Sequence, residues 1–226
     1  MASGSTVTNS TAVNNFGKGI VAGDGCTLSD SVANANSGDG FAAGKGCTVR
    51  HCSSYTNSGG GDGMEVGEGT AVIDCTSYNN TGYGILATNV SATVSGCTVY
   101  KNSQSGISIG AGIVTRCESS DNNFDGIRVI SACRITENKC YSNGPGGFLG
   151  AGIHVIQNDC TIENNIVAFN DYGFDVDSFP SVIIHNSARA NVTNNYEVSG
   201  GNFLGTIITT TASMNAAPNT YGNLSF

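Results

Sequence analysis

An aliphatic residue recurs along this chain at a nearly constant interval, and this repeat constrains the fold more than any other feature. The recurring positions, called anchors here, lie 20 to 27 residues apart: Val7, Leu28, Val49, Val72, Val94, Val114, Ile135, Ile162 and Ile183. Eight residues after each anchor stands an asparagine: Asn15, Asn36, Asn57, Asn80, Asn102, Asn122, Asn143, Asn170 and Asn191. Self-similarity at such a period is typical of repeat architectures, in which like units stack on one another.

Each unit contains about three short segments of alternating apolar and polar residues, separated by Gly or Asn, and no helical period is present. A unit this short cannot bury its own apolar side, so it must stack on its neighbours with like positions about 4.8 Å apart. Asn tolerates the left-handed backbone that a sharp corner needs, and its amide can bond to the Asn above and below. The repeat therefore predicts an all-β solenoid of about nine coils with an asparagine ladder.

The two ends of the chain differ from the repeat. The first coil begins in mid-unit with no N-terminal cap, so we expect self-association through that end. We place the coils at residues 1–195 and a C-terminal cap at 196–226, where "FLGTIITT" is predicted to form one last strand.

Composition narrows the set of partners. The formal net charge of −8 disfavours nucleic acid, because binding a phosphate backbone requires a basic surface. No run of 18 apolar residues exists, so we expect no membrane span.

Nine cysteines fall on positions that the repeat turns inward: Cys26, Cys47, Cys52, Cys75, Cys97, Cys117, Cys133, Cys140 and Cys160. Stacked cysteines have parallel Cβ vectors, which is poor geometry for a disulfide. We therefore predict a cysteine ladder of buried free thiols that pack as small hydrophobic groups.

Three features together resemble a known family. They are the Gly-Ile-x-Val strand, the Cys-Thr-Ile or Cys-Thr-Val strand and the corner Asn, and they extend over roughly residues 5–195. They resemble the right-handed parallel β-helix repeat proteins of the pectate-lyase-like superfamily. The resemblance implies a right-handed parallel β-helix, a fold that carries many chemistries and also non-catalytic proteins.

One outward column gathers titratable groups. Arg128, His154 and Asp175 occupy equivalent positions on three consecutive coils, about 5 Å apart, and Asp177 is the next outward residue. A cation, an imidazole and carboxylates could bind an acidic sugar and move a proton. The same groups could also form an ordinary salt-bridged strand face. No cofactor is indicated, although Asp175 and Asp177 offer oxygen ligands for calcium.

The phrase "YGFDVD", residues 172–177, is similar to the YGFDPHD motif of mannuronan C5-epimerases, parallel β-helices that act on alginate. The resemblance implies that Tyr172 and Asp175 take part in proton abstraction at C5. Val176 and Asp177 stand where the motif has Pro and His, so His154 from the preceding coil is the candidate to replace that His.

Tyr55, Tyr78 and Tyr100 occupy one column on successive coils, with Tyr141 two coils further on. Such a stripe could stack against sugar rings. The rings could equally stack only on each other and stabilise the sheet.

Two functional hypotheses follow. The first is a non-catalytic solenoid, a structural or polysaccharide-binding module of a surface or secreted protein, with an extracellular or cell-surface location. The second is a carbohydrate-active enzyme, a lyase or epimerase, acting on an acidic polysaccharide. The missing motif His favours the first.

Overall fold

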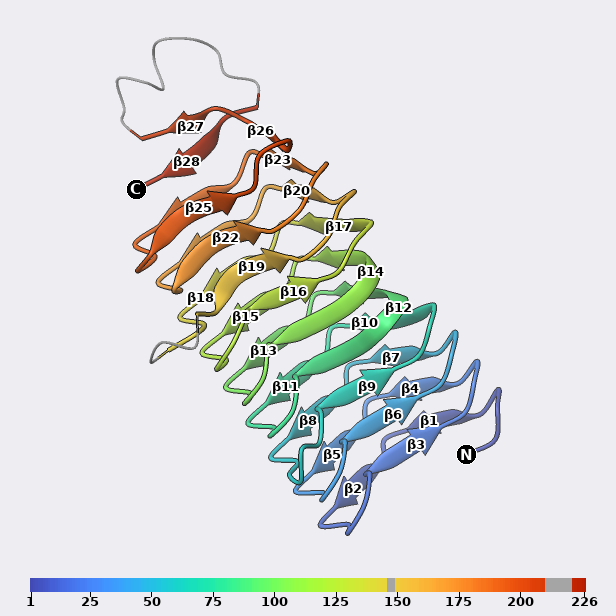
Figure 1. Cartoon of the computed structure of the whole chain (residues 1–226). Coiled ribbons are helices and arrows are strands. Elements are labelled where there is room, and N and C mark those ends of the chain that lie inside the picture. Colours follow the sequence, from blue (N-terminus) through green and yellow to red (C-terminus); the bar gives the residue numbers. More distant parts are fainter. Residues whose placement is uncertain (146–148, 210–220) are drawn as a thin grey trace.

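The structure is a computed structural model that describes residues 1–145, 149–209 and 221–226. All strand pairs among these residues are parallel, and each strand lies beside its counterpart in the next coil, as Figure 1 shows. The described chain is therefore an all-β parallel solenoid, as predicted. Three rows of strands run along it, and two of them join into a 17-stranded sheet, while the third forms an 11-stranded sheet.

The anchor row contains the recurring aliphatic residues. Its strands are β1 (Thr6–Thr8), β4 (Thr27–Ser29), β7 (Thr48–Arg50), β10 (Thr70–Ile73), β12 (Ile85–Ser95), β14 (Ile107–Thr115), β17 (Cys133–Thr136), β20 (Thr161–Glu163), β23 (Val182–Ile184) and β26 (Phe203–Leu204).

The glycine row follows the Gly-apolar dipeptides. Its strands are β3 (Ile20–Ala22), β6 (Phe41–Ala43), β9 (Met64–Val66), the first parts of β12 and β14, β16 (Ile127–Val129), β19 (Ala151–Val155), β22 (Tyr172–Val176) and β25 (Asn194–Val198). Because β12 and β14 extend through both rows, the two rows become one sheet.

The tyrosine row is the 11-stranded sheet. Its strands are β2 (Thr11–Val13), β5 (Val32–Asn34), β8 (Ser53–Tyr55), β11 (Thr76–Tyr78), β13 (Thr98–Tyr100), β15 (Glu118–Ser120), β18 (Lys139–Tyr141), β21 (Ile166–Ala168), β24 (Ser187–Arg189), β28 (Asn223–Ser225) and β27 (Ile207–Ile208).

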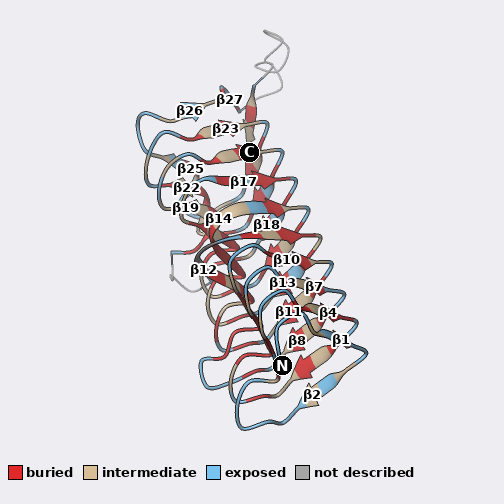
Figure 2. Cartoon of the chain, turned by 90° about the vertical axis from the view of Figure 1, so that its right-hand side faces the viewer, coloured by how far each residue is buried: buried red, intermediate tan, exposed pale blue. Residues whose placement is uncertain are grey.

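The core lies inside the coils. Anchors pair with anchors along the row, for example Val49 with Val72 and Val72 with Val94, and from Leu28 to Ile183 they are fully buried. Buried segments line the interior along the whole length of the stack, as Figure 2 shows. No helix among the described residues is long and apolar enough to cross a membrane.

The predicted asparagine ladder is continuous from Asn15 to Asn191. Asn102 Oδ1, for example, accepts hydrogen bonds from the backbone N–H of Asn80 at 3.1 Å and from its Nδ2 at 3.0 Å. One detail of the prediction is wrong, because the left-handed residue is the one before the ladder asparagine. Lys101, at φ 56°, is such a residue. The corner thus fixes the Asn side chain inward by bending the backbone one residue earlier.

All nine cysteines are buried and free, as predicted. Backbone N–H groups donate to the sulfur of the next coil in three places, as from Cys52 to Cys75 at 3.4 Å. The cysteines do not form one uninterrupted ladder, because other polar groups accept the equivalent N–H bonds on some coils. The N–H of Cys117, for example, donates to Asn138 Oδ1 at 2.9 Å. That contact starts a second asparagine ladder, which continues through Asn165, Asn186 and Asn223.

The described part of residues 196–226 extends the stack. In β25, Tyr196 pairs with Phe174, and in β26, Leu204 pairs with the anchor Ile183. The segment "FLGTIITT" contains two separate two-residue strands, β26 and β27, instead of the single strand that we expected. Gly205 lies between these two strands. A Cβ on this residue would be 1.8 Å from the carbonyl oxygen of Tyr221, so the close approach requires glycine. The capping role assigned to this segment stays a prediction.

Candidate functional site

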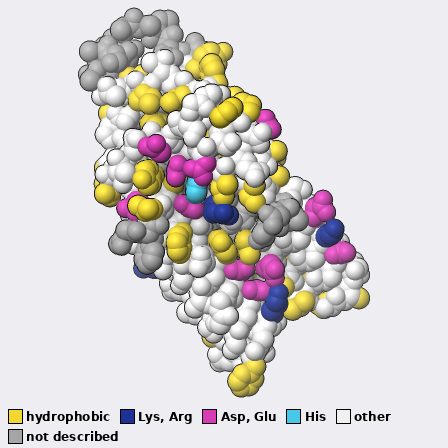
Figure 3. Space-filling model, in the orientation of Figure 1, with side chains coloured by type: hydrophobic (Ala, Val, Ile, Leu, Met, Phe, Trp, Pro, Cys, Tyr) yellow, Lys and Arg dark blue, Asp and Glu magenta, His cyan; other side chains and the backbone are white. Residues whose placement is uncertain are grey.

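The structure brings the titratable column together on the outer side of the glycine row. Arg128 on β16 pairs with His154 on β19, which pairs with Asp175 on β22, which in turn pairs with Glu197 on β25. Alternation along each strand turns these side chains outward, because their neighbours Ile127, Ile153 and Phe174 face the core. Acidic, basic and histidine side chains gather in the middle of the face in Figure 3.

His154 is the centre of the cluster. Its Nε2 lies 3.0 Å from Asp177 Oδ2 and 3.9 Å from Asp175 Oδ2, and its Nδ1 lies 3.4 Å from Asp125 Oδ2. The His154 side chain is 22% exposed, and that of Asp125 is 10% exposed. Both ring nitrogens therefore face carboxylates in a partly dehydrated setting.

These surroundings shift two pKa values. Burial lowers the pKa of His154, but the hydrogen bond and charge of Asp125, the hydrogen bond of Asp177 and the charge of Asp175 outweigh burial and raise that pKa to about 9. Burial raises the pKa of Asp175, the positive charge on His154 opposes the rise, and neighbouring carboxylates support it. At neutral pH the His154 ring is an imidazolium, and the Asp175 carboxyl group beside it holds a proton more readily than an ordinary aspartate does.

The sequence analysis did not assign Asp125 to this cluster. It precedes the Gly126-Ile127 dipeptide, and its Oδ1 accepts a hydrogen bond from the N–H of Ala151 at 2.9 Å. Asp39 and Asp62 occupy the same place before Gly-apolar dipeptides, and each also accepts a backbone N–H from the next coil. The recurrence of Asp-Gly was the available signal, but it indicates a structural role, and only the register shows the second oxygen of Asp125 facing His154.

Arg128 and Tyr172, the other two predicted site residues, lie differently. Within the described ranges, Arg128 makes no ion pair and no side-chain hydrogen bond, so its guanidinium is available to a ligand. Tyr172 lies at the start of β22, where it pairs with Ala151, and no hydrogen bond joins its hydroxyl to His154 or Asp175 in the part of the chain that the structure describes. The structure therefore groups Arg128, His154 and Asp175 more closely than it groups Tyr172 with them.

One set of side chains offers a possible metal geometry. One ligand atom each from His154, Asp175 and Asp177 lie within 4.8 Å of one another. A metal would have to displace the proton that the carboxylates hold on His154, because only neutral imidazole binds a metal. Calcium at Asp175 and Asp177 stays a prediction.

The three predicted tyrosines stack face to face. The ring centroids of Tyr55 and Tyr78 are 4.8 Å apart, and those of Tyr78 and Tyr100 are 4.9 Å apart, with interplanar angles of 9° and 0°. The faces of Tyr78 are therefore covered by its neighbours. A sugar could reach only ring edges, hydroxyl groups and the outer faces of the stack, which weakens the stripe as a platform.

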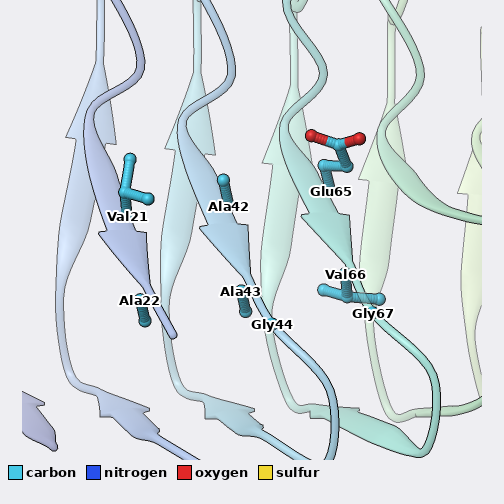
Figure 4. A pocket seen from close by; sticks show the side chains of 8 residues that line it. All are labelled: Val21, Ala22, Ala42, Ala43, Gly44, Glu65, Val66 and Gly67. Carbon is cyan, nitrogen blue, oxygen red and sulfur yellow. The ribbon is translucent and has the colours of Figure 1, made fainter. Parts of the chain in front are cut away.

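A shallow hollow lies on the glycine row toward the N-terminus. It has a volume of about 310 Å³, and its lining includes Val21, Ala42 and Glu65, whose positions Figure 4 shows. Ala42 pairs with Val21 on one side and with Glu65 on the other. The same outward column continues from Glu65 through two further coils to Arg128. Glu65 is ion-paired, because Lys18 Nζ lies 2.6 Å from it and 2.7 Å from Asp39.

Comparison with known proteins identifies the family. The family model described as a right-handed beta helix region matches residues 1–131 and 46–211. The chain belongs to this family. It is therefore a right-handed parallel β-helix, as the sequence resemblance implied. No curated protein sequence matches it significantly.

Two solved structures are similar to this β-helix. The A-module of mannuronan C-5 epimerase AlgE6 from Azotobacter vinelandii has a TM-score of 0.62 and 17% identity over 89% of this chain. Pectate lyase Pel9A has a TM-score of 0.49 and 14% identity over 92% of this chain. The chain spans 58% of the length of each of these proteins. At 17% identity the likeness to the epimerase module shows the fold alone.

Proposed function

We propose that this β-helix is a polysaccharide-binding module and that the outer side of its glycine row holds an acidic glycan. The observation that carries the proposal is the guanidinium of Arg128, which stands in register with His154 and makes no ion pair among the described residues. An arginine fork matches a carboxylate in two hydrogen bonds, so a uronate carboxylate is the ligand group that Arg128 suits best.

The neighbouring groups support the same ligand. Asp125 and Asp177 direct oxygens at the protonated ring of His154, which reduces the repulsion that they exert on an incoming anion. The upstream hollow at Val21 and Ala42 has small side chains that leave room for further sugar rings along the same line. The similar epimerase module acts on mannuronan by its name, so the fold is compatible with acidic chains.

A second candidate function is acid/base catalysis on such a chain. The observation that favours it is the raised pKa of Asp175 beside a protonated His154, because paired groups with perturbed pKa values are typical of catalytic sites. In this alternative, the Asp175 carboxyl group would exchange a proton with the sugar, and the protonated His154 would stabilise the carboxylate form of Asp175. A lyase or epimerase reaction is the class that such a proton transfer serves.

The test compares binding with turnover. Purified protein is titrated with polygalacturonate, with alginate and with a neutral glucan, while products are followed by ultraviolet absorbance and by NMR. We expect the acidic chains to bind and Arg128→Ala to weaken their binding about tenfold or more, as the loss of a charge-assisted bidentate pair implies. Arg134→Ala is the matched control, since Arg134 is an exposed arginine on β17 in the anchor row.

Each outcome is decisive. Equal binding of neutral and acidic chains, or equal loss in both arginine variants, would contradict the acidic-glycan proposal. If product forms and Asp175→Asn abolishes it without changing binding, the second candidate replaces a purely binding role. An extracellular or cell-surface location, where polysaccharides of this class are met, is part of the same proposal.

A further inference from the structure

The tyrosine row contains a gap in its column of rings. The pairing of strands β8 to β24 places these residues at equivalent positions: Tyr55, Tyr78, Tyr100, Ser120, Tyr141, Ala168 and Arg189. Where three consecutive coils carry tyrosine, the rings fill the column at one ring per coil. Ser120 and Ala168 both interrupt the column, and Ala168, which has only a methyl group, leaves the place of one ring empty between Tyr141 and Arg189.

That place is a hollow. It has a volume of about 360 Å³, and its lining includes Tyr141, Ala168, Phe169 and Arg189 together with Ile166. Ile166 is 46% exposed and Phe169 is 53% exposed, so two large apolar side chains stand open to solvent beside the gap. A sugar ring also has apolar C–H surfaces, and these pack well against such walls.

The rim of the hollow is positively charged. Lys139 and Arg189 both line it, although the chain has only 9 Lys and Arg residues against 17 Asp and Glu. The guanidinium of Arg189 lies 5.1 Å from the centre of the Phe169 ring. Glu118 is the carboxylate nearest in register to Lys139, and it accepts a hydrogen bond from the hydroxyl of Tyr141. Charge complementarity therefore favours an anion.

Phe169 is unusual for its place in the corner. Equivalent residues of other coils, including Asn79, Lys101 and Ser142, share its left-handed backbone, and Phe169 has a φ of 60°. A bulky side chain is strained in that region, whereas Asn is well tolerated. Strained residues of this kind are often retained at functional positions.

We propose that this hollow binds one uronate ring of an acidic glycan, stacked where the column lacks a ring, with its carboxylate toward Lys139 and Arg189. The two walls stand two coil spacings apart, about 9.6 Å. A flat aromatic ring in contact with both would need only about 7 to 8 Å. A puckered pyranose, which is thicker, fills the space better. This site lies on the tyrosine row and is separate from the Arg128 face.

The test uses trigalacturonate as the probe and maltotriose as its neutral counterpart, with binding followed by NMR and by calorimetry. Ala168→Tyr would add the missing ring, and we expect it to reduce trigalacturonate binding at this site by tenfold or more. Ala168→Ser keeps the gap open and should bind as the wild type does. Arg128→Ala should leave the resonance shifts around Phe169 unchanged, which separates this site from the function proposed above.

A second variant removes the charge and leaves the gap intact. The double variant Lys139→Gln, Arg189→Gln should lower trigalacturonate binding until it equals that of maltotriose. If Ala168→Tyr does not fold, this variant alone decides the matter. Wild-type affinity in the double variant, unchanged shifts at Phe169 in the presence of the probe, or tighter binding of maltotriose would each overturn the proposal.

Discussion

At the scale of single residues, His154 shows how this fold holds charge on a strand face. Its imidazolium is placed among three carboxylates, those of Asp175 on β22, of Asp177 just after β22, and of Asp125 before Gly126. Because the ring is mostly buried, its proton is held by these contacts more than by water.

The first prediction concerns pH. The pKa of His154 is about 9 in the folded protein and 6.5 in the unfolded chain. Its contribution to stability is therefore fully present below pH 6.5 and is lost as pH rises through about 9. We expect this contribution to be on the order of 3 kcal/mol, because each unit of pKa difference corresponds to about 1.4 kcal/mol. Urea unfolding of the wild type and of His154→Gln between pH 6 and pH 10 measures it, and a wild-type curve parallel to that of His154→Gln would contradict the assignment.

The second prediction concerns the ladder. Asn102→Ala removes an acceptor for the N–H and Nδ2 of Asn80 and a donor to Asn122 Oδ1. Since these groups are buried, we expect a loss of about 1–3 kcal/mol in the free energy of unfolding. Lys101→Ala, at the exposed neighbouring position, is the matched control and should change stability little. A loss of only a few tenths for Asn102→Ala would show that the ladder does not act as a continuous network.

The sequence predicted which residues would share a column, and it predicted less about what each would touch. Arg128, His154 and Asp175 could be aligned because each stands two residues after the glycine of a Gly-apolar dipeptide. Asp125 could not be assigned to the cluster, because its side chain crosses from the corner of one coil to the strand of the next. Such a contact depends on side-chain direction, which a repeat of residue types does not specify.

At the scale of elements, strands of three residues are stable here because each one after β3 pairs on both sides. Their inward positions carry Val, Ile, Cys and small residues, which pack into a narrow interior. The left-handed corner was expected at the ladder asparagine and lies one residue earlier, since the Asn must turn inward to reach its counterparts. The residue types in the sequence therefore predict where a corner lies, but they do not determine which of two neighbouring residues has the left-handed backbone.

The third prediction tests the cysteine positions as a set. Burial raises the pKa of the Cys140 thiol, and all nine thiols are buried. We expect the native protein to react slowly with a thiol reagent, and the protein denatured without reductant to show close to nine reactive thiols. Fewer thiols after denaturation would mean that disulfides form, and the packing interpretation would be wrong.

At the scale of the whole molecule, the rows give the β-helix two separate outer surfaces, and we propose each of them as a binding face. The glycine row carries the charged column around His154, and the tyrosine row carries the stack and its gap at Ala168. The sequence analysis did not predict the gap, which depends on the side chains that stand in register on three consecutive coils, Tyr141, Ala168 and Arg189. The second asparagine ladder ends with a bond from Asn186 to Asn223, which lies 37 residues later in the sequence. The repeat interval is much shorter than this separation, so it does not predict the contact.

The last prediction concerns the N-terminal edge of the stack. Within the described residues, β1, β2 and β3 each pair on one side only, and Val13 and Phe16 are 47% and 101% exposed. Unpaired strand edges with apolar side chains favour pairing with another chain, so we propose that this edge associates with a second copy. Hydrogen exchange should then show protection of the β1 to β3 amides that increases with protein concentration, while amides of β12 and β14 do not change.

Val13→Lys should remove this concentration dependence, because a charge on the edge opposes pairing. Val192→Lys, at a position 79% exposed on a corner near the other end of the coils, is the matched control and should retain it. Protection of β1 to β3 that is independent of concentration in the wild type would contradict the association. Equal effects of the two lysines would show instead that the association does not depend on this edge, because each lysine reduces the net charge of −8 by the same amount.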